Sequence, residues 1–272
     1  MDSRKKVAIL GGGNIGLAIA NGLVGSELFP SQNIFITKRK IDVLKDMAGK
    51  GFKITTDNLD AVKNSEIIIV AVQPKQLDEL LVSIAPSLDE RKHILISVVS
   101  SVSIRVIKKA IGEKIQVVRA MPNTAIAIRE SMTCLASDTK TNGALKIAEE
   151  IFSSVGKTLI IDEELIVPAT ALCACGIAFF LRAIRAASQG GIEIGFHSEE
   201  AIFMAAQTAK GAASLLVNTQ AHPESEVDKV TTPRGITISG LNQMEHNGFS
   251  SAMIKGITTS ADKAAKLYTG SE

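Results

Sequence analysis

The sequence is poor in cysteine and histidine, and this shortage excludes two kinds of site. Its three cysteines, Cys134, Cys173 and Cys175, are too few and odd in number for a disulfide framework. No Cys-x-x-Cys pair and no histidine close to a cysteine supplies the ligands of a zinc site, so we predict no metal. We therefore expect the cysteines to be reduced, buried thiols.

The sequence also lacks an excess of either charge. Lys and Arg total 30 against 28 Asp and Glu, which gives a net charge of +2. This balance predicts neither a nucleic-acid-binding protein nor a membrane-surface protein, and it leaves small anions as the expected ligands. We find no signal-peptide pattern and no apolar stretch of membrane-spanning length, and we therefore expect a cytoplasmic protein.

The first informative stretch is an apolar run, residues 7–10, followed by Gly11-Gly12-Gly13-Asn14-Ile15-Gly16. The spacing Gly-x-Gly-x-x-Gly between a strand and a helix is typical of a dinucleotide-binding turn. Gly11 permits the tight turn, Gly13 lets the backbone approach a pyrophosphate, and Gly16 lets the helix pack on the strand. The N–H groups of the helix that opens at Asn14 and Ile15 then point at the phosphates. A glycine-rich connection without a ligand has the same spacing, but the surrounding pattern favours the cofactor.

Strands and helices alternate through the first part of the chain. After residues 7–10, strands are predicted at residues 33–37, 53–55, 66–72, 93–99, 116–120, 131–136 and 157–161. This alternation predicts an α/β Rossmann-type N-terminal domain with a mostly parallel, doubly wound sheet, over residues 1–162.

After residue 162 the strand patterns nearly vanish. Helices are predicted at residues 163–172, 178–194, 198–217 and 250–267. These stretches are apolar over much of their circumference and need more cover than one small domain provides. We therefore expect an all-α C-terminal dimerisation and substrate domain, residues 163–272, that forms a homodimer.

The ends of the predicted strands indicate the cofactor. The second strand ends in Thr37-Lys38-Arg39-Lys40, where an NAD-preferring turn usually has Asp or Glu to bind the ribose 2′-OH. The cations favour a 2′-phosphate, so we predict NADPH as the preferred cofactor, with NADH possible as well. The alternative explanation of these charged residues is a solvated start of the next helix. Ligands lie beyond the carboxyl ends of parallel strands, so we expect four further residues to line the cofactor crevice: Ala71, Val72, Gln73 and Pro74.

Two turns remain ambiguous from the residues alone. Met121-Pro122-Asn123-Thr124 follows a strand and offers amide and hydroxyl groups where a nicotinamide lies, but it is also an ordinary turn. Residues 228–237, Asp-Lys-Val-Thr-Thr-Pro-Arg-Gly-Ile-Thr, could form an anion-binding concavity for a carboxylate. On turn chemistry alone, a capped connection between helices is the better explanation of that segment.

Taken together, these motifs resemble the pyrroline-5-carboxylate reductase family across essentially the whole chain. The resemblance implies an NADPH-linked reduction of the cyclic imine 1-pyrroline-5-carboxylate to L-proline, the last step of proline biosynthesis. It also implies a dimer with intertwined C-terminal helices, often assembled further, whose active site forms between two chains. In such a site Asn58 contacts the adenosine side of the cofactor and Asn123 the nicotinamide side.

The same resemblance implies the substrate-binding set. Thr237 places its hydroxyl near the imine nitrogen and is the expected catalytic residue. Backbone N–H groups around Gly235 and Ile236 bind the substrate carboxylate, with Thr232 in the same set. A hydroxyl suits this chemistry because it both donates and accepts, and no strong acid is needed when the substrate arrives as the iminium.

Four residues depart from the family pattern and leave alternatives open. Gln73 replaces a usual Lys, Arg234 replaces the first of two glycines, and Cys173 and Cys175 stand where serines are usual. One alternative is an NADP-linked reductase of another cyclic imine or a keto acid. The other is a non-catalytic dinucleotide-binding module. Reductases of 3-hydroxyacids use a Lys early in the helical domain, and the segment between Lys157 and Lys210 contains none.

Overall fold

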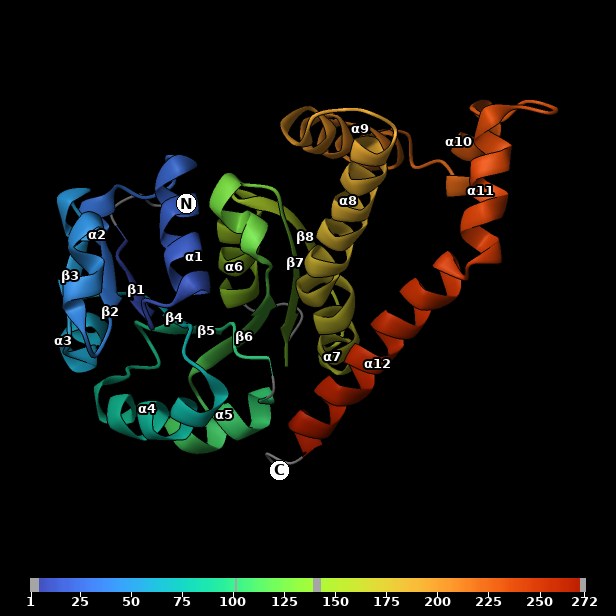
Figure 1. Ribbon diagram of the computed structural model, residues 1–272. Helices are drawn as coiled ribbons and strands as arrows, with labels where there is room; N and C mark the ends of the chain where they lie inside the picture. The colour runs from blue at the N-terminus through green and yellow to red at the C-terminus, as the bar shows by residue number, and fades with distance from the viewer. Residues whose placement is uncertain (1–4, 101, 139–142, 270–272) are drawn as a thin grey trace. The chain divides into compact units, whose positions relative to one another are not determined.

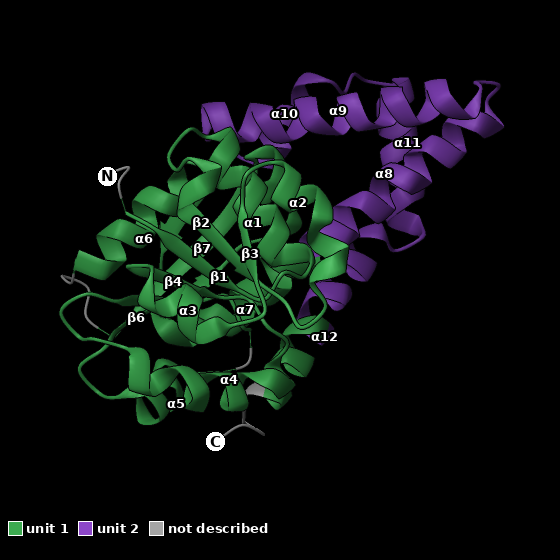
Figure 2. Ribbon diagram, turned by 90° about the vertical axis from the view of Figure 1, so that its left-hand side faces the viewer, with its two compact units in different colours: residues 1–175, 260–272 green, residues 176–259 purple. Residues whose placement is uncertain are grey.

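The computed structural model describes residues 5–100, 102–138 and 143–269. The chain forms two compact units (Figure 2). One contains the residues up to Cys175 and again those from Ser260, and the other is Gly176–Thr259. The predicted boundary between the cofactor-binding domain and the helical domain, at residues 162 and 163, stays a prediction, because the two units are defined by packing and not by role.

The first unit is built on one eight-stranded sheet in the order β3-β2-β1-β4-β5-β6-β7-β8. All neighbouring strands are parallel except β6 and β7. The predicted mostly parallel, doubly wound sheet is confirmed. Its strands are β1 Val7–Leu10, β2 Ile34–Thr37, β3 Lys53–Thr55, β4 Ile67–Val70, β5 Ile94–Ser97, β6 Gln116–Met121, β7 Ser131–Ser137 and β8 Gly156–Ile160.

The central strands form because they are apolar on both faces. Every residue of β1 (Val-Ala-Ile-Leu) and of β4 (Ile-Ile-Ile-Val) is buried. Such continuous apolar runs suit a parallel strand that is covered on both sides. The chain adds β2 and β3 on one side of β1 and then crosses to β4 on the other side. The strand order therefore reverses between β1 and β4, and this switch point is where open α/β sheets bind ligands.

Helices cover both faces of the sheet (Figure 1). One apolar layer packs α1 Asn14–Gly25, α2 Lys45–Gly49 and α6 Gly143–Ser153 against the sheet. The opposite layer contains α3 Asn58–Lys63, α4 Leu77–Ile84 and α5 Ile104–Ile111. Helix α5 is capped by Ser103, whose hydroxyl accepts a hydrogen bond from the N–H of Val106 at 3.2 Å. Short 3-10 turns connect these elements: η1 Ser31–Asn33, η2 Ile41–Leu44, η3 Pro74–Gln76, η4 Ala85–Ser87, η5 Thr124–Ile128 and η6 Glu163–Leu165.

The rest of the described chain is helical, as predicted. Its helices are α7 Ile166–Ala169, the π-helical η7 Thr170–Cys175, α8 Gly176–Glu193, α9 Ser198–Thr219, α10 Pro223–Lys229, α11 Ile236–His246 and α12 Phe249–Thr269. We did not predict α11, because its first turn is rich in β-branched residues that form helices poorly in isolation. The N-cap at Gly235 starts it nonetheless.

One expectation about apolar stretches is wrong. The two helices predicted at residues 163–172 and 178–194 are joined through η7 into one helical run, Glu163–Glu193, of 31 residues, and the most apolar 18-residue window of this run has a mean hydropathy of 2.0. By length and composition alone this run is able to cross a membrane, although a single such helix is weak evidence for a membrane protein. Only 17% of its most apolar window is buried within the chain, so the run has a large apolar surface that needs cover.

Candidate functional site

The glycine turn after β1 has the geometry that a dinucleotide site needs. Gly11 has φ +119, and a Cβ there would lie 2.4 Å from the carbonyl oxygen of Ala71. A Cβ on Gly16 would lie 2.1 Å from the carbonyl oxygen of Gly11. A Cβ on Gly13, in contrast, meets no heavy atom within 4 Å. The outer two glycines are therefore required by close packing inside the protein, whereas Gly13 borders open space in front of α1.

The first turn of α1 suits an anion. Gly13 is the N-cap, and the first turn contains no acidic residue. The N–H of Leu17 donates to the carbonyl oxygen of Gly13 at 2.9 Å, and the N–H groups before it begin the helix without an intrahelical acceptor. Asn14 is exposed and Ile15 is half-buried. This end of the helix provides partial positive charge and donors for a pyrophosphate.

The predicted 2′-phosphate residues lie at the end of β2, next to this turn. The N–H of Gly12 donates to the carbonyl oxygen of Thr37 at 2.8 Å, which ties the two segments together. The Thr37 side chain is only 3% exposed, so its hydroxyl faces the interior. Lys38 is half-buried, and Arg39 is exposed with its guanidinium 3.7 Å from a carboxylate oxygen of Glu79. Because both partners of that ion pair are well exposed, it is weak and easily exchanged for another anion.

The segment that follows β4 lies beside the glycine turn that follows β1. The N–H of Ala71 donates to the carbonyl oxygen of Leu10 at 2.8 Å, so β4 extends beside the glycine turn. Ala71 is buried, Val72 is half-buried, and Gln73 and Pro74 are exposed. The exposed pair therefore stands at the carboxyl edge of the strand, where we predicted the crevice.

Asn58 is the first residue of α3 and is half-buried. The helix is capped by the residue before it, Asp57, whose carboxylate accepts from the N–H groups of Leu59 and Asp60 at 2.8 and 3.1 Å. The Asn58 side chain is thus not needed as a helix cap and is available for a ligand. Its contact with the adenosine side of the cofactor stays a prediction.

The side-chain amide of Asn123 forms hydrogen bonds within the protein through both its oxygen and its nitrogen. It is 8% exposed and follows β6. Its oxygen accepts from the N–H of Ala125 at 3.0 Å, and its Nδ2 donates to the carbonyl oxygen of Cys173 at 3.3 Å. An amide nitrogen has two donors, so one N–H is left for a cofactor. The structure therefore links the predicted nicotinamide residue to η7, a contact between residues fifty positions apart that the sequence did not indicate.

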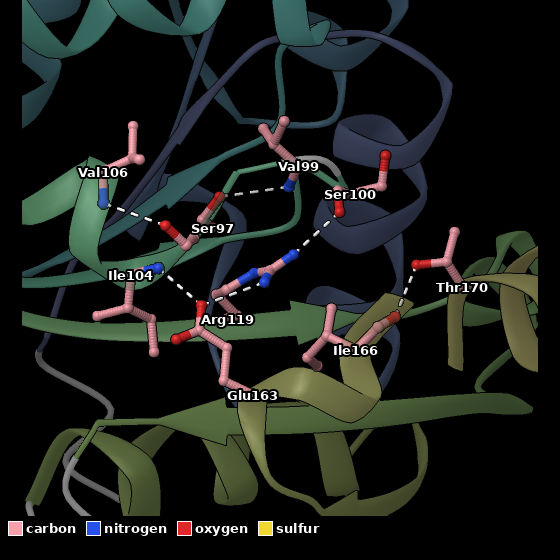
Figure 3. A network of polar contacts seen from close by, with 10 residues as sticks. Ser97, Val99, Ser100, Ile104, Val106, Arg119, Glu163, Ile166 and Thr170 are labelled. Atoms are coloured by element: carbon pink, nitrogen blue, oxygen red, sulfur yellow. Dashed lines mark hydrogen bonds and ion pairs between the residues drawn. The ribbon is translucent and has the colours of Figure 1, made fainter. Parts of the chain in front are cut away.

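A buried ion pair braces the same edge of the sheet (Figure 3). Arg119 on β6 is 1% exposed and donates to Glu163 Oε1 at 3.1 Å and to the carbonyl oxygen of Ser100 at 2.9 Å. The same Glu163 oxygen accepts from the N–H of Ile104, at the start of α5, at 2.7 Å. We did not predict this network, although an arginine inside the apolar run Val-Val-Arg-Ala-Met was a signal that a buried partner exists.

The predicted substrate residues lie in the second unit, at the start of α11. The N–H of Gly235 donates to the carbonyl oxygen of Thr232 at 2.8 Å across Pro233 and Arg234, which closes a β-turn. Arg234 has φ 60, the left-handed conformation that a type II turn requires at its third position, and Pro233 occupies the second position, where such turns commonly have proline. The Gly235 N–H is thus engaged within the turn, and the N–H groups of Ile236 and Thr237 open the helix.

Both Ile236 and Thr237 are exposed; the Ile236 side chain is 94% exposed. The segment is therefore a capped connection between helices, and it also presents backbone donors and the Thr237 hydroxyl at a helix N-terminus. Whether these groups bind the substrate stays a prediction.

Two cysteines lie together beside Asn123. All three cysteines are free thiols, and the Sγ atoms of Cys134 and Cys173 are 4.0 Å apart. The expectation of buried thiols holds for Cys134 but is wrong for Cys173 and Cys175, which are partly exposed. The hydrogen bond between the two sulfurs raises the pKa of the Cys134 thiol, as does burial, and the same hydrogen bond lowers the pKa of Cys173 to about 7.

Comparison with known families divides the chain into two matched regions. Residues 6–101 match the family model described as "NADP oxidoreductase coenzyme F420-dependent". Residues 163–267 match the model described as "Pyrroline-5-carboxylate reductase dimerisation". The second region contains the helical run with the uncovered apolar surface, so that surface coincides with a dimerisation domain.

The chain is also similar to individual proteins over almost its full length. It is 49% identical to pyrroline-5-carboxylate reductase 2 of Dictyostelium discoideum, over 98% of this chain and 94% of that protein. It is 58% identical to pyrroline-5-carboxylate reductase 1 of the same organism over 97% of this chain, and spans about half (50%) of that protein's length. A crystal structure of Plasmodium falciparum pyrroline carboxylate reductase with NADP bound has the same fold, with a TM-score of 0.89, 24% identity, and coverage of 98% of this chain and 99% of that one.

Proposed function

The chain belongs to the pyrroline-5-carboxylate reductase family, and we propose that it reduces 1-pyrroline-5-carboxylate to L-proline with NADPH, the last step of proline biosynthesis. The observation that carries this proposal is the 49% identity with a pyrroline-5-carboxylate reductase that the chain matches nearly end to end. The glycine turn and the Asn123 turn, which this reaction needs, both lie at carboxyl ends of strands in the sheet.

The residues of the first unit fit a dinucleotide phosphate. Open space in front of Gly13 and the acid-free first turn of α1 suit the pyrophosphate. Lys38 and Arg39, at the end of β2, provide two cations for a 2′-phosphate, and on this basis we assign the preference to NADPH over NADH. Asn58 and the segment from Ala71 to Pro74 complete the proposed cofactor set, together with the free N–H of Asn123.

When bound, NADPH supplies the hydride. The chain's own residues then hold the imine acid in place for transfer, and this positioning lowers the barrier because the reacting groups are already oriented. The backbone N–H groups that open α11 bind the substrate carboxylate, and Thr232 and Gly235 shape the turn that presents them. Thr237 stabilises the ring nitrogen by a hydrogen bond as electron density builds on it.

We assign the dimer contact to the C-terminal helices. The matched dimerisation region, residues 163–267, contains large exposed apolar side chains, including Phe180, Leu181 and Phe203 at 61, 59 and 71% exposure. A homodimer that buries them accounts for their number, and further assembly of dimers and a cytoplasmic location are part of the same proposal. Sedimentation at several concentrations tests the dimer: a monomer throughout the range contradicts it.

A substrate panel distinguishes this proposal from its alternatives. The purified protein is offered NADPH with 1-pyrroline-5-carboxylate, with its six-membered cyclic imine homologue, and with a keto acid. The proposal requires the highest kcat/KM for the five-membered imine. Turnover of another compound alone indicates a different reductase, and tight NADPH binding without turnover of any compound indicates a binding module.

Two variants of one residue test the proposed catalytic group. Thr237→Ala removes the hydroxyl and is expected to lower kcat/KM by about tenfold or more, mainly through kcat. Thr237→Ser keeps the hydroxyl and is expected to retain most of the activity. Equal kinetics for both variants and the wild type remove Thr237 from the mechanism.

A further inference from the structure

The two adjacent thiols differ in their surroundings. Cys134 lies on β7, is 4% exposed and belongs to an apolar cluster with Met121, Ala136 and Ile166. Cys173 lies in η7 and is partly exposed. The lowered pKa of Cys173 makes a substantial fraction of it thiolate at neutral pH, and the thiolate is the form that oxidants attack. An accessible, reactive cysteine therefore touches a shielded one.

We propose that Cys173 and Cys134 form a site of reversible oxidation, in which a hydroperoxide oxidises Cys173 and Cys134 then closes a disulfide. The sulfurs are 4.0 Å apart and a disulfide needs about 2 Å, so closure requires a local shift rather than a change of fold. The pair combines the two features of redox-sensing thiols, an accessible nucleophile and an adjacent resolving cysteine.

The chemistry balances in two steps. The Cys173 thiolate attacks one oxygen of the hydroperoxide: a sulfur–oxygen bond forms, the oxygen–oxygen bond breaks, and the leaving alkoxide or hydroxide takes up a proton. Cys173 is then a sulfenic acid. The Cys134 sulfur attacks it, a sulfur–sulfur bond forms, and the hydroxyl leaves as water with the Cys134 proton. Two thiols and one hydroperoxide thus give one disulfide, one alcohol or water, and one further water, and a dithiol reverses the change.

The consequence for the enzyme follows from Asn123 and rests on the proposed function. The carbonyl oxygen of Cys173 accepts the hydrogen bond from Asn123 Nδ2 at 3.3 Å. Movement of Cys173 toward Cys134 displaces that carbonyl and releases the amide that faces the nicotinamide side in the proposed site. We therefore expect the disulfide to raise the KM for NADPH by about fivefold, the effect of losing one hydrogen bond.

Peptide mapping tests the site independently of activity. Reduced protein is exposed to hydrogen peroxide, the remaining thiols are alkylated, and the digest is analysed by mass spectrometry without reduction. We expect the Cys134–Cys173 linked peptides in the wild type and in the matched control Cys175→Ser, and their loss after treatment with dithiothreitol. In Cys134→Ser, or in Cys134→Ala if the serine variant does not fold, Cys173 is expected to accumulate as sulfenic acid that dimedone traps. A Cys173–Cys175 link, a link between chains, or no linked peptide overturns the proposal.

Kinetics on the same samples test the regulatory part. The expected result is a higher KM for NADPH after oxidation in the wild type and in Cys175→Ser, restored by dithiothreitol and absent in Cys173→Ser relative to its own reduced form. A linked pair with unchanged NADPH kinetics overturns the connection to Asn123 and leaves the oxidation site standing. If no imine is reduced in any sample, the proposed function has failed, and the peptide map still decides whether the disulfide forms.

Discussion

Arg119 and Glu163 form an ion pair that joins the sheet to the start of the helical region (Figure 3). The Arg119 side chain is 1% exposed and that of Glu163 27%, with Nη1 and Oε1 3.1 Å apart. Because Glu163 Oε1 also accepts from the N–H of Ile104, one carboxylate holds β6, α5 and η6 together. Removal of its charge leaves the arginine buried without a counter-ion, which is far more costly than loss of a surface pair.

We predict that Glu163→Gln lowers the free energy of unfolding by about 1–3 kcal/mol. The neighbouring Glu164 is exposed, so Glu164→Gln is the matched control and is expected to change stability by less than about 0.5 kcal/mol. Urea unfolding measures both. Equal stabilities for the two variants contradict the structural role of the pair.

The glycine turn predicts opposite outcomes for two similar substitutions. Gly16→Ala places a methyl group 2.1 Å from the Gly11 carbonyl oxygen and is expected to destabilise the fold by about 1–3 kcal/mol. Gly13→Ala meets no protein atom, so stability stays within about 1 kcal/mol, but the methyl group occupies the space of the pyrophosphate. Thermal unfolding and NADPH titration separate the two effects. Gly13→Ala with wild-type NADPH affinity contradicts the assigned site.

Cofactor preference depends on the cations after β2. We predict that Lys38→Ala and Arg39→Ala each raise the KM for NADPH by about tenfold and leave the KM for NADH nearly unchanged, since only NADPH has the 2′-phosphate. Lys45→Ala, which removes an exposed cation paired with Asp42, is the control. The increase in the KM for NADPH that these substitutions cause is expected to be smaller at high salt, because ions screen exposed charges. Parallel changes for both cofactors show that the residues act elsewhere.

His93 gives a pH-dependent contribution to stability. Its ring accepts from the N–H of Asp89 at 2.8 Å and lies 3.2 Å from the Val62 carbonyl oxygen. Burial, followed by the charge of Lys92, lowers the pKa of His93 below its ordinary value of 6.5. The unfolded chain therefore takes up the proton first, and the protein loses stability as the pH falls below about 6.5.

Replacement of that histidine tests this sign. His93→Asn is expected to flatten the loss of stability between about pH 6.5 and 5, whereas substitution of the exposed His246 by Asn leaves the slope of the wild type. Urea unfolding across this range is the measurement. An unchanged slope in His93→Asn means that other groups account for the loss.

The sequence was sufficient for features that depend on local pattern. The strands β1 and β4 were predictable because continuous apolar runs form buried parallel strands, and the roles of Gly11 and Gly16 followed from their spacing. Helix α11 was missed because its β-branched first turn opposes local helix propensity, whereas the N-cap at Gly235 that starts the helix is set by the turn before it.

Contacts between distant residues could not be predicted. The hydrogen bond from Asn123 to Cys173 spans fifty positions, and the pair of Arg119 with Glu163 spans forty-four. The left-handed turn at Arg234 was also outside local prediction, since that conformation favours glycine and costs arginine about 1 kcal/mol or more. The resemblance to a known family named this position as a departure without showing its conformation.

The most direct test of the central claim follows the hydride. The purified protein is given 1-pyrroline-5-carboxylate and NADPH labelled with deuterium at the transferred position, and both NADPH consumption and the proline formed are measured. We predict L-proline with one deuterium at ring carbon C5 for each NADPH consumed, and a slower reaction with NADH. Binding of NADPH without formation of labelled proline contradicts it.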